Sequence, residues 1–234
     1  MTEENVAIVT AAGSGIGEAC ARRLHEDGYI PVLLSPSGSA VEVATELGGD
    51  GFEGSVTEPD DLAALVEATE DRYRRIDAVV NNTGHPPSGD LLDITDDEWY
   101  EGLDLVLLNT IRMARLVTPI MKEHGGGAFV NISTFSAFEP SPEFPVSSVL
   151  RAALGSYTKL YADQFAADGI RMNTVQPGFV DSYEIDEETR ARIPMGRSAQ
   201  TSEIADTVAY LLSSEASYIT GQNIRVDGGL TASV

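Results

Sequence analysis

The chain has 234 residues, of which 42% are hydrophobic and 22% are charged, and its 15 basic and 37 acidic side chains give a formal net charge of −22. This length and composition are typical of one globular domain with a large core. Because nucleic acids and anionic membranes repel so acidic a protein, we expect neither as a partner.

Targeting and redox signals predict a cytoplasmic protein. The acidic start, residues 1–4, lacks the pattern of a signal peptide, and no apolar run is long enough to cross a membrane. The single cysteine, Cys20, excludes an internal disulfide, and we interpret it as a packing residue in a reducing compartment. Three scattered histidines and one cysteine show no metal-ligand spacing, so no metal is expected.

The N-terminal segment predicts a strand, a turn of small residues and a helix. Four apolar residues at 6–9 are typical of a short buried strand, and residues 18–27 are typical of a helix that ends before Gly28. Between them lies the turn that the rest of the fold is built around. Its backbone N–H groups and the positive end of the helix would face an anion, and glycine lets the backbone approach that anion closely. The turn therefore predicts a phosphate cradle.

Strand and helix signals alternate through the rest of the chain. Further strands are predicted at residues 29–34, before Ser55, and at 78–81, 128–132, 170–175 and 222–226. Helices are predicted at residues 39–47 and 58–73, as a pair from Thr95 through Asn109 to about residue 123, and at 148–167 and 201–213. The alternation predicts an α/β fold with a doubly wound, seven-stranded parallel sheet of the Rossmann type, formed as a single domain by residues 1–234. Ligands of such a sheet bind at the carboxyl ends of its strands.

Five separated stretches resemble motifs of the short-chain dehydrogenase/reductase (SDR) family. They are the small-residue turn at 10–17, Asn-Asn-Thr-Gly at 81–84, Val-Asn-Ile-Ser-Thr at 130–134, and the segments 169–178 and 218–229. The resemblance covers nearly the whole chain. It implies a nicotinamide dinucleotide cofactor, NAD or NADP, a small-molecule substrate and commonly a homotetramer. The apolar stretches 105–108 and 219–226 also favour a homo-oligomer, either a tetramer or a dimer.

The resemblance also locates the catalytic positions, and here the chain departs from the family. The family's tyrosine acid/base falls on Ser147, its lysine on Arg151 and its serine on Thr134, whereas its asparagine is kept as Asn109. A serine hydroxyl is shorter and far less acidic than a phenol. Arginine can hold a ribose or a carboxylate but does not give up a proton. The sequence therefore predicts an atypical member without the usual proton donor.

The cofactor positions implied by the resemblance are only partly of the usual type. They are Ala11, Ser14, Gly15, Ile16, Gly17, Ser35, Ser55, Val56, Asn81, Thr83, Gly84, Arg151, Pro177, Gly178 and Val180. Ala11 replaces the first glycine of the turn, at small cost if its φ is negative. Ser35 ends the second strand and is neither the acid that favours NAD nor a base that favours NADP. We therefore expect weak binding without a marked preference.

Other side chains could replace the missing proton donor. His85 follows a strand end and titrates near neutrality, so it is a candidate acid/base, with an exposed loop histidine as the alternative. Tyr157 and Tyr161 are interpreted as packing residues. Three acidic residues, Glu139, Glu143 and Asp181, are interpreted as solvated charges over the site, with proton transfer as the alternative.

Three functions remain open at this point. The first is an NAD(P)-linked oxidoreductase that acts on a small carbonyl or alcohol with a non-standard proton donor. The second is a cofactor-free lyase or isomerase, similar to the halohydrin dehalogenases, which also replace the lysine with arginine but keep the tyrosine. The third is a catalytically inactive binding or assembly subunit. The retained turn at 10–17 favours the first over the second, and the joint loss of tyrosine and lysine favours the third.

Overall fold

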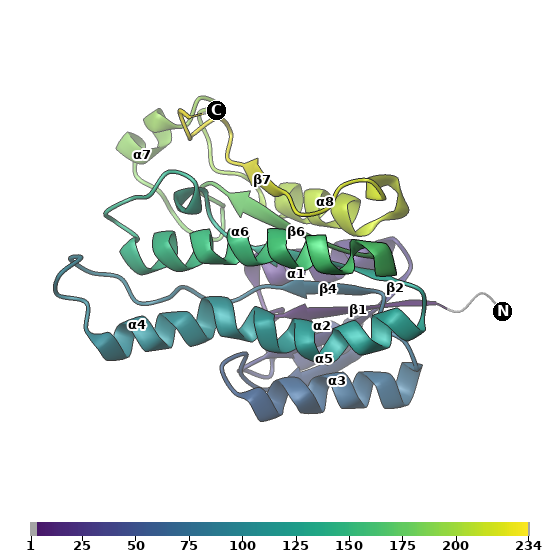
Figure 1. Cartoon of the computed structure of the whole chain (residues 1–234). Coiled ribbons are helices and arrows are strands. Elements are labelled where there is room, and N and C mark those ends of the chain that lie inside the picture. Colours follow the sequence, from purple (N-terminus) through teal and green to yellow (C-terminus); the bar gives the residue numbers. More distant parts are fainter. Residues whose placement is uncertain (1–3, 234) are drawn as a thin grey trace.

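The structure is a computed structural model that describes residues 4–233, so most of the acidic start lies outside the described residues. Its centre is one seven-stranded parallel sheet with the strand order β3-β2-β1-β4-β5-β6-β7 (Figure 1). The strands are β1 (Asn5–Thr10), β2 (Tyr29–Ser35), β3 (Asp50–Glu53), β4 (Ala78–Asn81), β5 (Gly127–Ile132), β6 (Ile170–Pro177) and β7 (Asn223–Val226). The doubly wound sheet expected from the sequence is confirmed.

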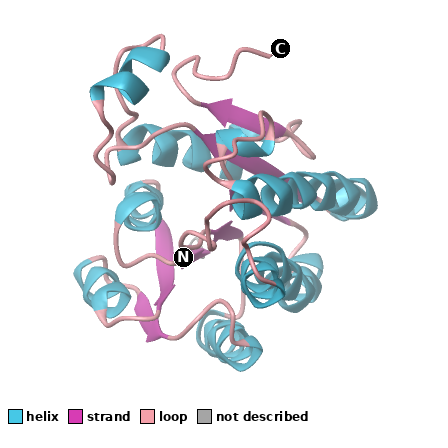
Figure 2. Ribbon diagram, turned by 90° about the vertical axis from the view of Figure 1, so that its left-hand side faces the viewer, coloured by secondary structure: helices cyan, strands magenta, loops and turns pink. Residues whose placement is uncertain are grey.

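Helices cover both faces of this sheet (Figure 2). They are α1 (Gly15–Glu26), α2 (Ser39–Glu46), α3 (Pro59–Tyr73), α4 (Asp96–Leu103), α5 (Asn109–Glu123), α6 (Pro145–Phe165), α7 (Glu187–Arg192) and α8 (Thr201–Leu212). Apolar residues of α1, α2 and α8 form one buried cluster with the sheet, and those of α3, α5 and α6 form the other.

The pleat of β1, an inner strand of the sheet, explains the two clusters. In β1, Ala7 and Val9 face the α1 and α8 side, whereas Val6 and Ile8 face the α3 and α5 side. All four side chains are fully buried, as expected of a parallel strand covered on both faces. The near-continuous apolar run at residues 6–9 is thus the direct sequence signature of its position inside the sheet.

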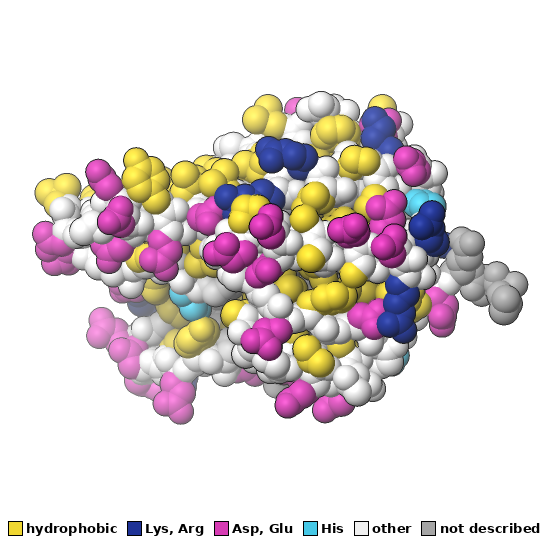
Figure 3. Space-filling view, turned by 90° about the horizontal axis from the view of Figure 1, so that it is seen from below, with side chains coloured by type: hydrophobic (Ala, Val, Ile, Leu, Met, Phe, Trp, Pro, Cys, Tyr) yellow, Lys and Arg dark blue, Asp and Glu magenta, His cyan; other side chains and the backbone are white. Residues whose placement is uncertain are grey.

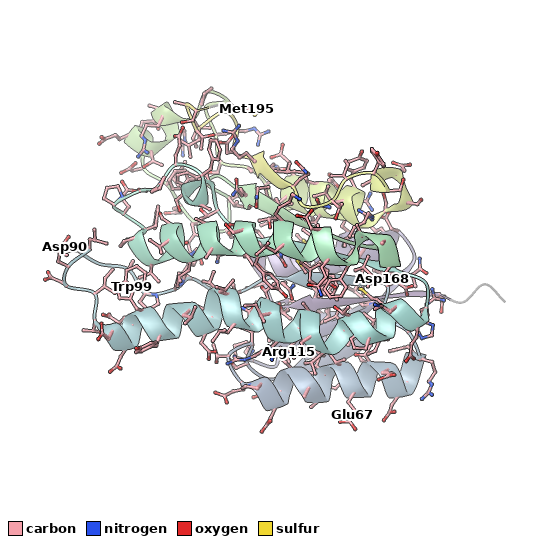
Figure 4. All side chains as sticks on the ribbon, viewed as in Figure 1. Glu67, Asp90, Trp99, Arg115, Asp168 and Met195 are labelled. Carbon is pink, nitrogen blue, oxygen red and sulfur yellow. The ribbon has the colours of Figure 1, made fainter. Side chains whose placement is uncertain are left out.

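The chain reverses its winding at β1, which pairs with β2 on one side and with β4 on the other. The strand order changes direction here, and ligands of doubly wound sheets bind at such a switch point. The segments that follow β4 and β6 extend beyond the strand ends at the left of Figure 1. In Figure 4, Asp90 and Trp99 mark the first of these segments, and Met195 lies beside the second.

Local structure departs from the sequence expectations at three points. Helix α6 begins at Pro145 rather than at residue 148, because proline is favoured in the first turn of a helix. A π-helical turn, Asp104–Leu108, separates α4 from α5. The short helix α7 lies in a segment where no helix was expected. The N-cap prediction at Thr95 is confirmed, with Glu98 completing a capping box.

The surface is strongly acidic, and Asp and Glu side chains outnumber Lys and Arg on the face in Figure 3. Within residues 4–233, none of the helices combines the length and apolarity that a bilayer crossing requires. The homo-oligomer expected from residues 105–108 and 219–226 stays a prediction.

Candidate active site

The turn after β1 is held against the end of β4 by reciprocal hydrogen bonds. The Thr10 hydroxyl donates to the Asn82 carbonyl at 2.6 Å and accepts from the Asn82 N–H at 2.9 Å. The Asn82 amide also donates to the Ala11 carbonyl at 3.2 Å. These bonds fix the β1 turn beside the first turn of α1, whose N–H groups have no partners within the helix.

Two backbone positions show how tightly this turn is built. A Cβ on Gly17 would lie 2.2 Å from the Ala11 carbonyl oxygen, so only glycine fits there. Ala11 has a φ of +46°, so the condition under which alanine would fit at small cost, a negative φ, is not met. The left-handed conformation costs an L-residue about 1 kcal/mol, and the three bonds around the turn hold it in place. The turn is therefore closely packed, and its role as a phosphate cradle stays a prediction.

A cavity of about 800 Å³ opens where β1, β4, β5 and β6 end. Thirteen of the positions singled out from the sequence line it: Ala11, Ser14, Gly15, Ile16, Thr83, Gly84, His85, Thr134, Ser147, Arg151, Pro177, Gly178 and Val180. They come from the α1 turn, the strand ends, α6 and the segment after β6. The cavity thus joins the phosphate cradle to the positions of the catalytic residues.

Three predicted cofactor positions lie outside this cavity, towards α2 and α3. The Ser35 hydroxyl donates to the Ser37 carbonyl at 2.7 Å and accepts from the Ala40 N–H. The Ser55 hydroxyl lies 2.8 Å from that of Thr57, and Val56 is buried. Ser35 therefore offers a ribose no free, charged group.

Two predicted amide side chains are committed to bonds inside the fold. Asn81 donates to the Asn131 side chain at 2.8 Å, and Asn131 donates to Thr158 on α6 at 3.0 Å. Asn109 follows the π-helical turn, donates to the Leu105 carbonyl and accepts from the Thr110 hydroxyl. Neither amide lines the cavity, so in this structure both position the backbone around it.

Arg151 is the buried cation of the cavity, with an exposed fraction of 5%. Its guanidinium donates to the Ile132 carbonyl, at the end of β5, and more weakly to the Gly84 carbonyl at 3.5 Å. Burial lowers the pKa of Arg151 to about 10, which leaves it charged at neutral pH. No carboxylate of the described residues forms an ion pair with Arg151.

His85 lines the cavity beside this cation. Partial burial, and secondly the Arg151 charge, lower the pKa of His85 below its usual 6.5. The imidazole is therefore mainly neutral at pH 7 and available as a proton acceptor. Its ring contacts that of Tyr183 edge to face, with centroids 4.9 Å apart.

Hydroxyl groups complete this half of the cavity. Ser147 lies in the first turn of α6 and is half-buried, and Thr134 caps the short helical turn after β5. The Ser133 hydroxyl is buried and lacks a hydrogen-bond partner. Since buried polar groups are normally bonded, the Ser133 hydroxyl has an unmet hydrogen-bonding capacity.

Sequence reasoning missed several lining residues. Tyr183 lies after β6, and an apolar wall is formed by Phe135, Phe144 and Phe179. The Phe135 ring lies 5.4 Å from that of Phe179 and 6.5 Å from that of Phe144. These positions fall in loops with no periodic pattern, and the only signal was their proximity to strand ends.

Other candidates lie away from the cavity. Glu139 accepts from the Ser233 N–H at 2.5 Å and Asp181 from the Thr201 N–H at 3.0 Å, and neither these two nor Glu143 line it. Tyr161 is buried against Thr118, with Tyr157 beside it, and Cys20 is fully buried, so all three are packing residues as expected. Among the described residues no group of three His, Cys, Asp or Glu side chains could hold a metal ion.

Comparisons with known proteins agree with this geometry. A family profile described as Enoyl-(Acyl carrier protein) reductase matches residues 10–231. The chain is 31% identical over 241 residues to 3-oxoacyl-(acyl-carrier-protein) reductase FabG of Thermotoga maritima, covering 97% of this chain and 98% of that protein. It is 34% identical over 240 residues to dehydrogenase/reductase SDR family member 4 of Pongo abelii, covering 96% and 86%.

A solved structure is similar over almost its whole length. L-sorbose reductase of Gluconobacter frateurii, in complex with NADPH and L-sorbose, has a TM-score of 0.90 and 26% identity, with 99% of this chain and 98% of that chain covered. A sheet of this topology with a phosphate cradle at its switch point defines a dinucleotide-binding α/β protein. More specifically, the chain belongs to the short-chain dehydrogenase/reductase family and is an SDR-type oxidoreductase.

Proposed function

We propose that the protein is an NAD(P)-linked oxidoreductase that acts on a small carbonyl or alcohol and does not use a phenol at position 147. One observation carries this proposal: a single cavity joins the α1 N-terminus to Arg151, His85 and Ser147. The first feature suits a cofactor pyrophosphate, and the others are groups that can hold or protonate a substrate oxygen.

The residues present fit the cofactor class that the SDR relatives use. Gly17 lets the first turn of α1 pack against the Ala11 carbonyl, and the N–H groups of that turn have no partners within the helix and would bind a pyrophosphate. Pro177, Gly178 and Val180 would form the wall at the nicotinamide end. A bound nicotinamide dinucleotide supplies or accepts the hydride at the substrate carbon.

The chain's own residues would handle the substrate oxygen. In the reductive direction the carbonyl carbon gains a hydride and the oxygen gains a proton, so one group must orient the oxygen and another must supply the proton. Thr134 and Ser147 offer hydroxyls that can orient it. His85 would exchange the proton, and Tyr183 would hold the imidazole by its edge-to-face contact. The phenylalanine wall would exclude water.

One observation favours a second function. Serine stands where a phenol would act, and the Arg151 guanidinium is held by two backbone carbonyls. A catalytically inactive binding subunit needs neither a phenol nor a mobile cation. The cofactor-free lyase or isomerase gains no such support, because it has no use for the cradle at Gly17.

Titration calorimetry with NAD⁺, NADH, NADP⁺ and NADPH tests the proposal. We expect weak binding of both types with less than about tenfold preference, or about 1.4 kcal/mol, because Ser35 carries no charge. A panel of ketones, aldehydes and alcohols should then show slow turnover of a few compounds. No binding of any dinucleotide would favour the cofactor-free function, and binding without turnover would favour the inactive subunit.

A further inference from the structure

Within residues 4–233, Arg151 is a buried charge without a counter-charge. Burial alone lowers the pKa of Arg151, and its hydrogen-bond partners are two neutral carbonyl oxygens. The one acidic residue among those lining the cavity, Glu184, is exposed on the segment after β6. Burying a cation without an anion is unfavourable, so the free protein keeps a group whose electrostatic partner is missing.

A half-buried arginine, Arg171, shows what a purely structural role looks like in this chain. Arg171 donates to the carbonyls of Leu211, Leu212 and Ser213 at the end of α8 and, more weakly, to Ile219. These carbonyls lie at the negative end of a helix, which offsets the charge. Arg171 does not line the cavity, whereas Arg151 does.

The surroundings of Arg151 specify the chemistry of the missing partner. An arginine has five N–H donors in a planar fork, and only two bonds are made here, so donors remain for a planar anion. The Ser133 hydroxyl, buried and without a partner, lines the same cavity and can add a further bond. A ribose would supply hydroxyl oxygens but no negative charge.

A part of the cavity wall is apolar. Phe135, Phe144 and Phe179 line the cavity, with ring centroids 5.4 and 6.5 Å from that of Phe135. A ligand with a carboxylate at one end and an apolar, ring-bearing body would bind both Arg151 and the three phenylalanine rings.

We propose that Arg151 and Ser133 bind the carboxylate of the substrate, which is a 2-oxo acid or 2-hydroxy acid with an apolar side chain. This inference rests on the proposed function and narrows its substrate class. Reduction would transfer a hydride to C2 of the 2-oxo acid and a proton to its oxygen, which gives the 2-hydroxy acid and the oxidised dinucleotide.

The test compares phenylpyruvate with its amide, which has a similar shape and no charge. Calorimetry is run with and without NADP⁺, because the oxidised dinucleotide cannot reduce either compound. We expect the wild type to bind phenylpyruvate at least about tenfold more tightly than the amide. Phenylpyruvate should also raise the melting temperature of the wild type.

Three variants test whether Arg151 causes the preference for phenylpyruvate over its amide. Arg151→Met should abolish it, and Arg151→Lys should keep a part, because lysine has the charge without the fork. Arg115→Met is the matched control, since Arg115 lies on α5, outside the cavity (Figure 4). If Arg151→Met does not fold, the wild-type comparison of acid and amide and the Arg151→Lys variant still test the inference.

The outcomes separate this inference from the proposed function. Equal binding of acid and amide by the wild type, with dinucleotides bound, overturns the inference alone. A preference that survives in Arg151→Met overturns it too, as does a variant that loses only dinucleotide affinity, since Arg151 would then serve the ribose. A preference for the acid without any dinucleotide binding overturns the proposed function and leaves the anion site standing.

Discussion

The two halves of the cavity tolerate sequence change very differently. The cradle half works through backbone N–H groups, so alanine at position 11 leaves its shape in place at the cost of a strained φ of +46°. In the function that we propose, the reaction half works through side chains, and no backbone group can replace the phenol that the family resemblance implies at position 147. Recognition by backbone survives substitutions that end side-chain chemistry. Each of the following predictions would break or sharpen this contrast.

The largest effect is expected from Gly17→Ala. Its Cβ would fall 2.2 Å from the Ala11 carbonyl oxygen and 2.8 Å from the Asn82 amide, so the turn must move. We expect the affinity for dinucleotides to fall at least about 100-fold, or about 2.7 kcal/mol, as measured by calorimetry. Affinity within a fewfold of wild type would mean that the cradle does not hold the cofactor.

Gly28→Ala is the control for backbone strain. Gly28 follows α1 with a φ of +87° and has open space around it. Alanine there should lower the free energy of unfolding by about 1 kcal/mol and leave dinucleotide binding unchanged. Comparing Gly17→Ala with Gly28→Ala thus distinguishes a loss of stability from a loss of dinucleotide binding.

His85→Asn tests the reaction half. In alcohol oxidation the neutral imidazole accepts the proton, so the wild-type rate should fall as pH drops through the lowered pKa, below 6.5. We expect the variant to lose about 100-fold in rate and to lose this acid limb, measured on the fastest alcohol of the panel. An unchanged rate and pH profile would remove His85 from the mechanism.

The titration of His85 should also change the free energy of unfolding, in a direction that follows from its lowered pKa. The folded protein binds the His85 proton less tightly than the unfolded chain, so His85 lowers the stability as pH falls below 6.5. The melting temperatures of the wild type and His85→Asn should therefore converge above that pH.

Tyr183→Phe keeps the ring against His85, so its reaction rate should still fall at low pH as in the wild type.

The smallest effect is expected from Ala11→Gly. Glycine adopts a φ of +46° without strain, although it also makes the unfolded chain more flexible. We expect the free energy of unfolding to rise by up to about 1 kcal/mol, with dinucleotide affinity unchanged, by thermal melting and calorimetry. A marked loss of affinity would show that the cradle depends on the methyl group.

Much of the fold was predictable because its signals are local. The apolar run at 6–9, the small-residue turn and the capping residue Thr95 each report on neighbours in sequence, and the structure confirms them. The π-helical turn at Asp104–Leu108 and the positive φ of Ala11 were missed. At Ala11 a tertiary contact, the Asn82 bond to its carbonyl, holds the turn against the local preference for a negative φ.

The cavity was predictable only in part, for a similar reason. Motif spacing located Arg151 and His85, because the fold brings strand ends together at one edge. The motifs did not reveal that Arg151 lacks a carboxylate partner or that the Ser133 hydroxyl is free. Such facts depend on which side chains are absent from a neighbourhood, and sequence patterns report only which are present.

The acidic surface gives ionic strength two opposing effects on any anionic ligand. With a net charge of −22, the protein repels such a ligand at long range, and salt relieves this repulsion because the Debye length shortens to about 8 Å near 0.15 M. Once inside, the ligand meets Arg151, where small anions of the salt compete for the same guanidinium. Added salt therefore speeds the encounter and weakens the final contact, so anionic ligands should bind best at an intermediate salt concentration.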